Sequence, residues 1–183
     1  MSKNNLKFIK IDPNYIKFLL QFDNKVQYND NKLKKDNKPF LGVLFTINNH
    51  DYYVPISSAN KKKRLIKMHK NYKKTNKSNV DLIFIEDKNR NLLSVLNLNN
   101  MIPVAKNSII EFEFKNDNNY ILLQKEFKFC NKNKKQIRER AIKIYNIVRK
   151  HTNKRIESRC CDFIMLENKA KEYENKTSIN VWH

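Results

Sequence analysis

Residues 52–64 read YYVPISSANKKKR, and this stretch decides the fold and the chemistry that we expect. An apolar run typical of a β-strand ends in the hydroxyls of Ser57 and Ser58, and a run of cations begins three residues later at Lys61. Hydroxyls can hydrogen-bond phosphate oxygens, and ammonium groups can offset charge that grows in a transition state. RNA is therefore the first substrate to consider, although taken alone the two serines fit a polar strand end equally well.

Apolar runs separated by turn residues continue on both sides of this stretch. Residues 40–47 and 52–56 are apolar and β-prone, and the turn cluster 48–51 lies between them, which predicts a β-hairpin. Residues 80–86 and 92–98 predict a second hairpin. Shorter strands are expected at residues 6–11, 101–104 and 109–114.

Helical signals occur near both ends of the chain. Asp12 followed by Pro13 is typical of a helix start, and apolar spacing extends this helix over residues 13–23. Asp162 can cap a final helix. Between these two helices, apolar residues at helical spacing predict a further helix with one apolar stripe, formed by Ile137, Ala141, Ile144, Tyr145 and Val148. This order of elements predicts an α+β fold, with a twisted antiparallel β-sheet or partial barrel and surrounding helices.

The chain has 183 residues, and we expect a single domain with an ordered core at about 6–173 and a tail at 174–183. No apolar run is long enough to span a membrane, and residues 1–10 lack the apolar segment of a secretory signal. Three cysteines do not make an even disulfide framework, so reduced thiols and a cytoplasmic location are expected.

A net charge of +20 indicates a polyanionic partner, either nucleic acid or an anionic membrane surface. Codon bias competes as an explanation, because the chain has 29 Asn and one Gly, as an AT-rich genome produces. The charges are clustered, however. Residues 59–80 contain nine Lys or Arg and no acidic residue, and residues 128–159 contain twelve Lys or Arg. The first tract is expected to form a basic loop or a helix with one cationic face. Clustering favours a nucleic-acid footprint, with a solvated charged face as the alternative.

Several kinds of catalytic site are disfavoured by the residues. None of the four histidines lies beside a paired carboxylate or cysteine in the sequence, and acids are scarce near Ser57 and Ser58. With Gly42 as the only glycine, a glycine-rich phosphate loop cannot form. We therefore expect no metal and no cofactor.

Blocks of sequence along the chain resemble the ToxN/AbiQ family, the endoribonuclease toxins of type III toxin–antitoxin and phage-defence systems. Residues 38–42 (KPFLG) are similar to the family's K-x-F-[IL]-G, and residues 50–58 (HDYYVPISS) to its H-x-Y-x-x-P-[LI]-[TS]-S. Residues 97–103 (NLNNMIP) resemble N-L-x-x-M-I-P, and residues 161–169 (CDFIMLENK) resemble C-[ND]-F-x-x-L-E-x-K. The blocks occur in order over about 6–173.

The resemblance implies a fold similar to the MazF/Kid toxins, a twisted antiparallel sheet that is nearly a barrel. It implies metal-independent cleavage of single-stranded RNA that leaves a 2′,3′-cyclic phosphate and a 5′-hydroxyl. It also implies inhibition by a repeated, folded RNA antitoxin, with a pseudoknot expected, in a closed protein–RNA assembly. Abortive-infection phage defence is the expected biological role, and neither a membrane nor DNA is an expected partner.

The resemblance also implies site residues. The family's first lysine corresponds to Lys38, its [TS]-S pair to Ser57 and Ser58, and its second lysine to Lys61, with Lys62 as the alternative. Some members have an active-site tyrosine four residues before the first lysine, where this chain has Lys34. Either Tyr28 replaces that tyrosine, or this protein does without it. The expected RNA-binding residues are Tyr28, Lys34, Lys62, Lys63, Arg64, Lys134, Lys135 and Arg138.

In the expected mechanism, a ribose 2′-hydroxyl attacks its own phosphate. Lys61 stabilises the developing charge, Ser57 and Ser58 hold non-bridging oxygens, and Lys38 orients phosphate or transfers a proton. Two other classes of protein compete with this reading. One is a non-catalytic RNA-binding module, and the weaker one is a membrane-surface protein, disfavoured because the helices lack an exposed apolar face.

Overall fold

The computed structural model describes residues 5–27, 39–58, 62–77, 79–113, 115 and 117–179. Within these residues the strands are β1 (Lys7–Ile11), β2 (Phe40–Gly42), β3 (Thr46–Ile47), β4 (His50–Ser58), β5 (Leu82–Glu86), β6 (Leu92–Asn97), β7 (Ile102–Val104) and β8 (Ile109–Glu111). The helices are α1 (Pro13–Leu20), α2 (Lys63–Thr75), α3 (Tyr120–Lys132), α4 (Lys134–Arg149), α5 (Lys154–Glu157) and α6 (Phe163–Ile179), with short 3₁₀ turns η1 (Leu98–Asn100) and η2 (Lys106–Ser108).

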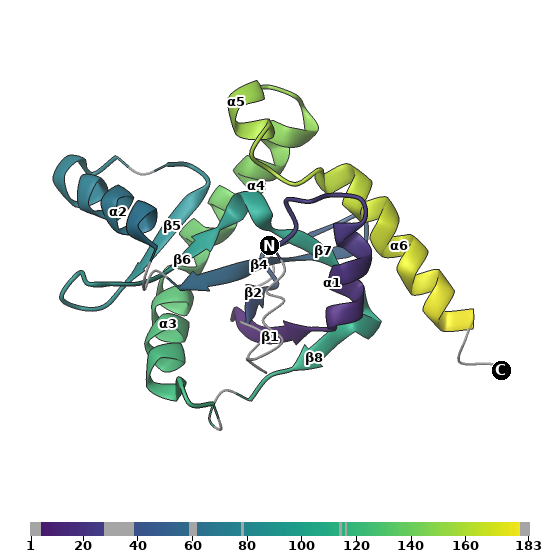
Figure 1. Ribbon diagram of the computed structural model, residues 1–183, viewed down its shortest axis with the longest axis horizontal. Helices are drawn as coiled ribbons and strands as arrows, with labels where there is room; N and C mark the ends of the chain where they lie inside the picture. The colour runs from purple at the N-terminus through teal and green to yellow at the C-terminus, as the bar shows by residue number, and fades with distance from the viewer. Residues whose placement is uncertain are drawn as a thin grey trace.

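The strands form one antiparallel sheet around β4 (Figure 1). The main path runs β5-β6-β4-β2-β1-β8, and β3 and β7 also pair with β4. The path has two ends, β5 and β8, so the sheet is open rather than a closed barrel. Its mixture of helices and antiparallel strands confirms the predicted α+β class.

The predicted helix starts are confirmed by their capping bonds. The Asp12 carboxylate accepts from the backbone N–H of Asn14 at 2.8 Å, with Pro13 at the first helical position, although α1 ends three residues earlier than predicted. The Asp162 carboxylate accepts from the N–H of Met165 at 3.0 Å and caps α6, which continues to Ile179. The whole apolar stripe predicted for α4 is buried.

The first hairpin differs in detail from its prediction. The apolar run 40–47 is divided between β2 and β3, and His50 and Asp51 belong to β4 instead of the turn. Asn48 and Asn49 make the turn, with φ values of 49° and 64°. Left-handed conformations suit asparagine better than most other non-glycine residues, which explains this position of the turn.

One buried carboxyl ties three elements of the main core together. Glu167 of α6 is 5% exposed and accepts from the hydroxyls of Tyr52 on β4 and Tyr145 on α4, both at 2.8 Å. Burial, together with Glu167, raises the pKa of both tyrosines. Both phenols therefore remain protonated donors, and α4 and α6 are fastened over the strand that ends in Ser57 and Ser58.

A second, smaller cluster holds α2 against the β5–β6 hairpin. Leu82, Phe84 and Val95 are buried beneath partly buried residues that include Leu65, Met68 and Tyr72 of α2. His69 of α2 is also buried and lies 2.5 Å from Glu86 of β5. Figure 1 places α2 at the opposite side of the molecule from α6. We call these residues the α2 cluster.

The three cysteines are buried free thiols. Burial raises the pKa of Cys160 to about 12, so its thiolate is disfavoured at neutral pH. Across the described ranges, no helix combines the length and the apolar character that crossing a membrane requires.

Candidate active site

The two candidate hydroxyls lie at the end of β4 but on different faces of the sheet. Ser57 is paired with Val95 and Ser58 with Ser94 of β6. Successive side chains of a strand point to opposite faces, so Ser57 shares a face with the α2 cluster and Ser58 shares the other face with Ser94. Ser57 is 5% exposed, whereas Ser58 is more open.

Both described flanks of segment 28–38 meet at this strand end. On one side, the Oε1 of Gln27 accepts from the Ser57 hydroxyl at 3.2 Å. On the other side, the carbonyl of Pro39 accepts from the N–H of Ile56 at 3.3 Å. The candidate residues Tyr28, Lys34 and Lys38 belong to that segment and lie outside the described residues. Gln27 and Pro39, the described residues on either side of that segment, therefore contact Ser57 and Ile56, respectively.

Amide side chains extend from Ser57 into a polar network. Gln27 Nε2 donates to Asn100 Oδ1 at 3.5 Å, and Asn97 Nδ2 donates to the same oxygen at 2.9 Å. Asn100 Nδ2 in turn donates to the backbone carbonyl of Lys25 at 2.7 Å. The motif 97–103 was evident in the sequence only as a resemblance, and its link to Ser57 through Gln27 was not predicted.

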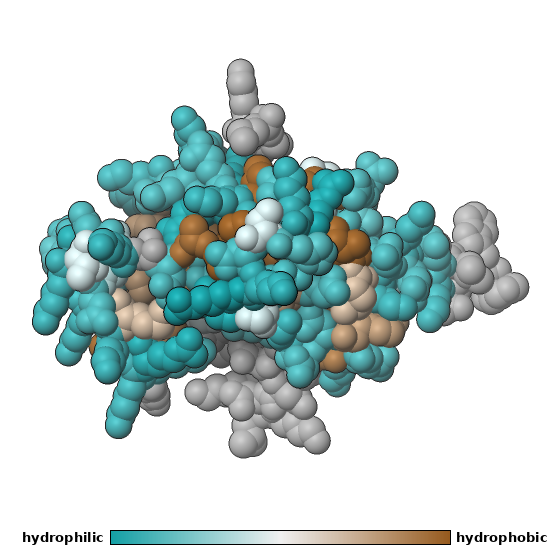
Figure 2. Space-filling view, turned by 90° about the horizontal axis from the view of Figure 1, so that it is seen from above, coloured by the Kyte–Doolittle hydropathy of each residue, from teal (hydrophilic) through white to brown (hydrophobic). Residues whose placement is uncertain are grey.

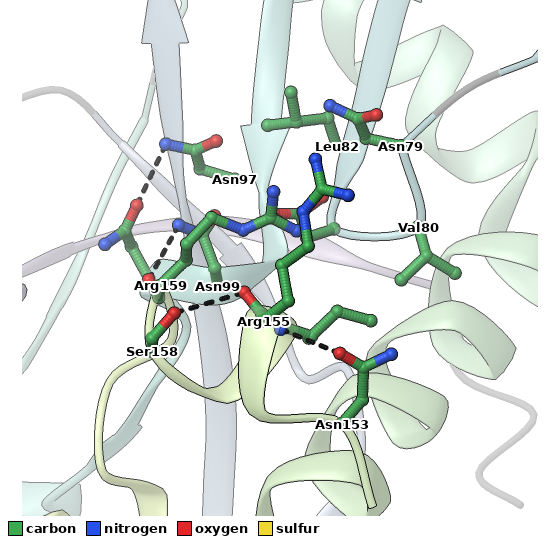
Figure 3. Close-up of polar contacts among 12 residues, drawn as sticks. Asn79, Val80, Leu82, Asn97, Asn99, Asn153, Arg155, Ser158 and Arg159 are labelled. Atoms are coloured by element: carbon green, nitrogen blue, oxygen red, sulfur yellow. Dashed lines mark hydrogen bonds and ion pairs between the residues drawn. The ribbon is translucent and has the colours of Figure 1, made fainter.

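The turn that carries Asn100 is itself held by hydrogen bonds to the segment between α5 and α6 (Figure 3). The side chain of Asn99 donates to the carbonyl of Arg159 at 3.1 Å, and the N–H of Cys161 donates to the carbonyl of Asn99 at 2.8 Å. The Asp23 carboxylate accepts from the N–H groups of Lys25 and Asp162 at 2.9 and 2.7 Å. These bonds place the chain before Gln27 firmly beside η1.

On the other side of Ser58, the chain leads into the basic helix α2. Lys61 lies outside the described residues, and Lys62 is the N-cap residue of α2, where its side chain makes no capping bond. Lys62, Lys63 and Arg64 are exposed, and the first turn holds no acidic residue. Cations at a helix N-terminus are unfavourable to the helix dipole, so helix stability does not explain them. Seen from above, the end of the molecule formed by α2 is largely hydrophilic (Figure 2).

The second basic tract is engaged in the fold to a greater degree than the sequence predicted. Arg138 is 8% exposed and donates to the carbonyl of Val43 at 3.2 Å, so its guanidinium serves the fold and does not support the predicted RNA contact. Arg140 donates to the carbonyls of Asn79, Val80 and Leu82, and Arg159 pairs with Asp81 at 3.2 Å.

Two other predicted RNA contacts lie at the start of α4. Lys134 donates to the side chain of Asn5 at 2.9 Å, and Lys135 is exposed. No described contact links either residue to Ser57 or Ser58, so their role in RNA binding stays a prediction.

The open antiparallel sheet, the serine pair that ends its central strand and the basic helix α2 all lie within a region that matches a known protein family. A family model described as "Toxin ToxN, type III toxin-antitoxin system" matches residues 7–171. The chain belongs to this ToxN family.

Curated relatives match nearly the whole chain. Endoribonuclease ToxN of Bacillus thuringiensis subsp. kurstaki is 31% identical over an alignment of 185 positions that includes 96% of this chain and 88% of the relative. Endoribonuclease ToxN of Pectobacterium atrosepticum is 26% identical, with 92% and 94% covered. Endoribonuclease AbiQ of Lactococcus lactis subsp. lactis is also 26% identical, with 94% and 92% covered.

Solved structures share the fold. A bacterial type III toxin studied for its selective inhibition by a non-coding RNA pseudoknot is 30% identical, with a TM-score of 0.77 over 93% of this chain and 99% of its own. The lactococcal anti-phage endoribonuclease AbiQ is 23% identical, with a TM-score of 0.79 over 94% and 99%, and supports the fold.

Proposed function

We propose that this protein is an endoribonuclease toxin that cleaves single-stranded RNA in the cytoplasm and serves in phage defence. The observation that carries the proposal is the convergence at Ser57 and Ser58. Both described flanks of segment 28–38 meet at this strand end, and the basic helix α2 begins five residues after Ser58 in the chain. Relatives at 26–31% identity over nearly the whole chain are endoribonucleases, which supports the same activity here.

The proposed chemistry uses the substrate's own nucleophile. The oxygen of a ribose 2′-hydroxyl forms a bond to the adjacent phosphorus and gives up its proton to a general base, for which neutral Lys38 is the candidate, and the bond from phosphorus to the 5′-oxygen breaks. That oxygen takes up a proton, so the products are a 2′,3′-cyclic phosphate and a 5′-hydroxyl. Lys61 offsets the charge that grows on the phosphorane, and Lys38 orients phosphate or transfers a proton. The more open Ser58 donates to a non-bridging oxygen.

The proposed inhibitor is a folded RNA antitoxin with repeated sequence. A structural neighbour at 30% identity is inhibited by a non-coding RNA pseudoknot, and a polyanion of this kind suits a chain of net charge +20. Exposed Lys62, Lys63 and Arg64 beside the strand end supply contacts to its phosphates.

The test is cleavage of RNA by purified, antitoxin-free protein in EDTA. We expect cleavage with cyclic phosphate at the new 3′ ends, and its loss in Lys61→Ala. The matched control is Lys88→Ala, which removes an exposed lysine from the β5–β6 turn and should cleave normally. Specific RNA binding without cleavage by the wild-type protein would instead establish a non-catalytic RNA-binding module.

A further inference from the structure

In the amide network beside Ser57, the groups that each side-chain amide meets determine which of its ends donates and which accepts. A backbone carbonyl can only accept, so the Asn100 side chain must direct its NH₂ group to Lys25 and its oxygen the other way. Gln27 faces that oxygen and must present its own NH₂ group, which turns Oε1 of Gln27 toward Ser57. Exchanging the nitrogen and oxygen of any of these amides would oppose like groups.

The Ser57 hydroxyl is therefore a donor inside the protein. Its hydrogen is directed to Gln27 at 3.2 Å, and its remaining lone pairs can only accept. The non-bridging oxygens of a phosphodiester carry no hydrogen, so they do not complement these lone pairs. The group that does is a hydroxyl, and RNA cleavage by internal attack brings one hydroxyl to the reacting phosphate, the ribose 2′-hydroxyl.

We propose that Gln27 and Asn100 are positioning residues that hold the Ser57 hydroxyl hydrogen away from the substrate, so that Ser57 Oγ accepts from the attacking 2′-hydroxyl. This inference rests on the proposed function. Accepting that hydrogen bond fixes the rotation of the nucleophile and aims its lone pair at phosphorus. Ser57 keeps its own proton throughout, and the 2′-proton passes to the base of the reaction.

The contact also selects for RNA over DNA, because DNA has no donor at this position. Burial of Ser57, at 5% exposure, makes an unmatched oxygen there costly and sharpens the preference. Without the network the Ser57 hydroxyl can turn toward phosphate, so the expected defect lies in the chemical step and not in RNA affinity.

The first test is a double-mutant cycle in single-turnover cleavage. Gln27→Met keeps the length of the side chain and removes its hydrogen-bonding groups; we expect a 10- to 100-fold slower cleavage rate with RNA affinity within about twofold of wild type. Because Gln27 acts through Ser57, adding Gln27→Met to Ser57→Ala should slow cleavage less than twofold further.

Gln124→Leu, on the exposed face of α3, is the matched control, and thermal melts verify folding of each variant. Where Gln27→Met does not fold, the neutral variant Gln27→Ala supplies the same comparison. Multiplicative effects of Gln27→Met and Ser57→Ala on the cleavage rate would overturn the inference. Absence of cleavage by wild type would instead refute the proposed function.

The second test identifies the donor. In a Lys61→Ala background, oligonucleotides with a 2′-hydroxyl or a 2′-fluoro group at the mapped cleavage nucleotide are compared in binding. Fluorine cannot donate, so we expect about fivefold weaker binding of the fluoro RNA, and equal binding once Ser57→Ala is added. A fluoro penalty that persists in the Ser57→Ala variant would contradict the assignment.

Discussion

Charge reversal at the start of α2 should stabilise the protein while lowering its affinity for RNA. Lys63 and Arg64 are in the first turn, where the helix dipole disfavours cations, and Lys62 supplies no side-chain cap. Replacing both with glutamate turns two unfavourable interactions into favourable ones. At about 0.3–1 kcal/mol for each interaction, we expect the free energy of unfolding to rise by about 1–2 kcal/mol after screening by salt.

The same two residues are proposed to contact phosphates. The slope of log affinity against log salt concentration is negative, and each lost contact with single-stranded RNA should make it shallower by about 0.7, or by about 1.4 for the pair. Urea unfolding measures the stability, and fluorescence anisotropy with a labelled oligonucleotide at several salt concentrations measures the slope.

The matched control lies at the other end of the same helix. Lys73 and Lys74 occupy the last turn, where cations favour the dipole, so Lys73→Glu with Lys74→Glu should destabilise the protein. Both double variants change the net charge of +20 by the same amount, so overall repulsion cancels from the comparison. The reasoning is refuted if both variants shift stability in the same direction, or if the first leaves the RNA slope unchanged.

Three further predictions concern the core. Glu167→Ala leaves the buried hydroxyls of Tyr52 and Tyr145 without their acceptor. We expect it to lower the free energy of unfolding, measured in urea, by about 2–6 kcal/mol. Glu167→Gln keeps an oxygen that can accept, so it should lower the free energy of unfolding by less than half as much. Burial raises the pKa of Tyr53 and of Tyr145 to about 12, above the value of about 10 in an unfolded chain. The stability that these tyrosines contribute should therefore be complete below pH 10 and be lost between pH 10 and 12. Denaturation followed by circular dichroism at several pH values measures this loss. Gly42→Ala would put a methyl group within 3 Å of three ring carbons of Tyr53 and should cost about 1–3 kcal/mol; a melting temperature equal to wild type would contradict this packing.

Local signals predicted the elements that local chemistry controls. Asp12 and Asp162 marked helix starts because a carboxylate satisfies free N–H groups wherever the helix lies. Helix α3 was missed, and its buried side chains include the polar Glu126, which interrupts an apolar stripe. Arg138 was expected to face RNA, although its place three residues before buried Ala141 already put it on the inward side of α4.

The candidate site was predictable in its residues but not in its contacts. Ser57 and Ser58 were evident as hydroxyls at a strand end. The partner of Ser57, Gln27, is 30 residues away in the sequence, and Asn100 is 73 residues from Gln27. Amide side chains carry no periodic pattern, and which of them meet depends on how strands and turns pack. Only the fold can show that the motif around Asn100 supports the serine.

The separate packing of α2 has a consequence for motion. Its apolar contacts are confined to the α2 cluster, so the helix can detach from the β5–β6 hairpin while the main core stays folded. Its backbone amides should therefore exchange with deuterated solvent through this partial opening, faster than those of α4. RNA bound across α2 would slow that exchange, which makes the helix a local reporter of occupancy at the neighbouring strand end.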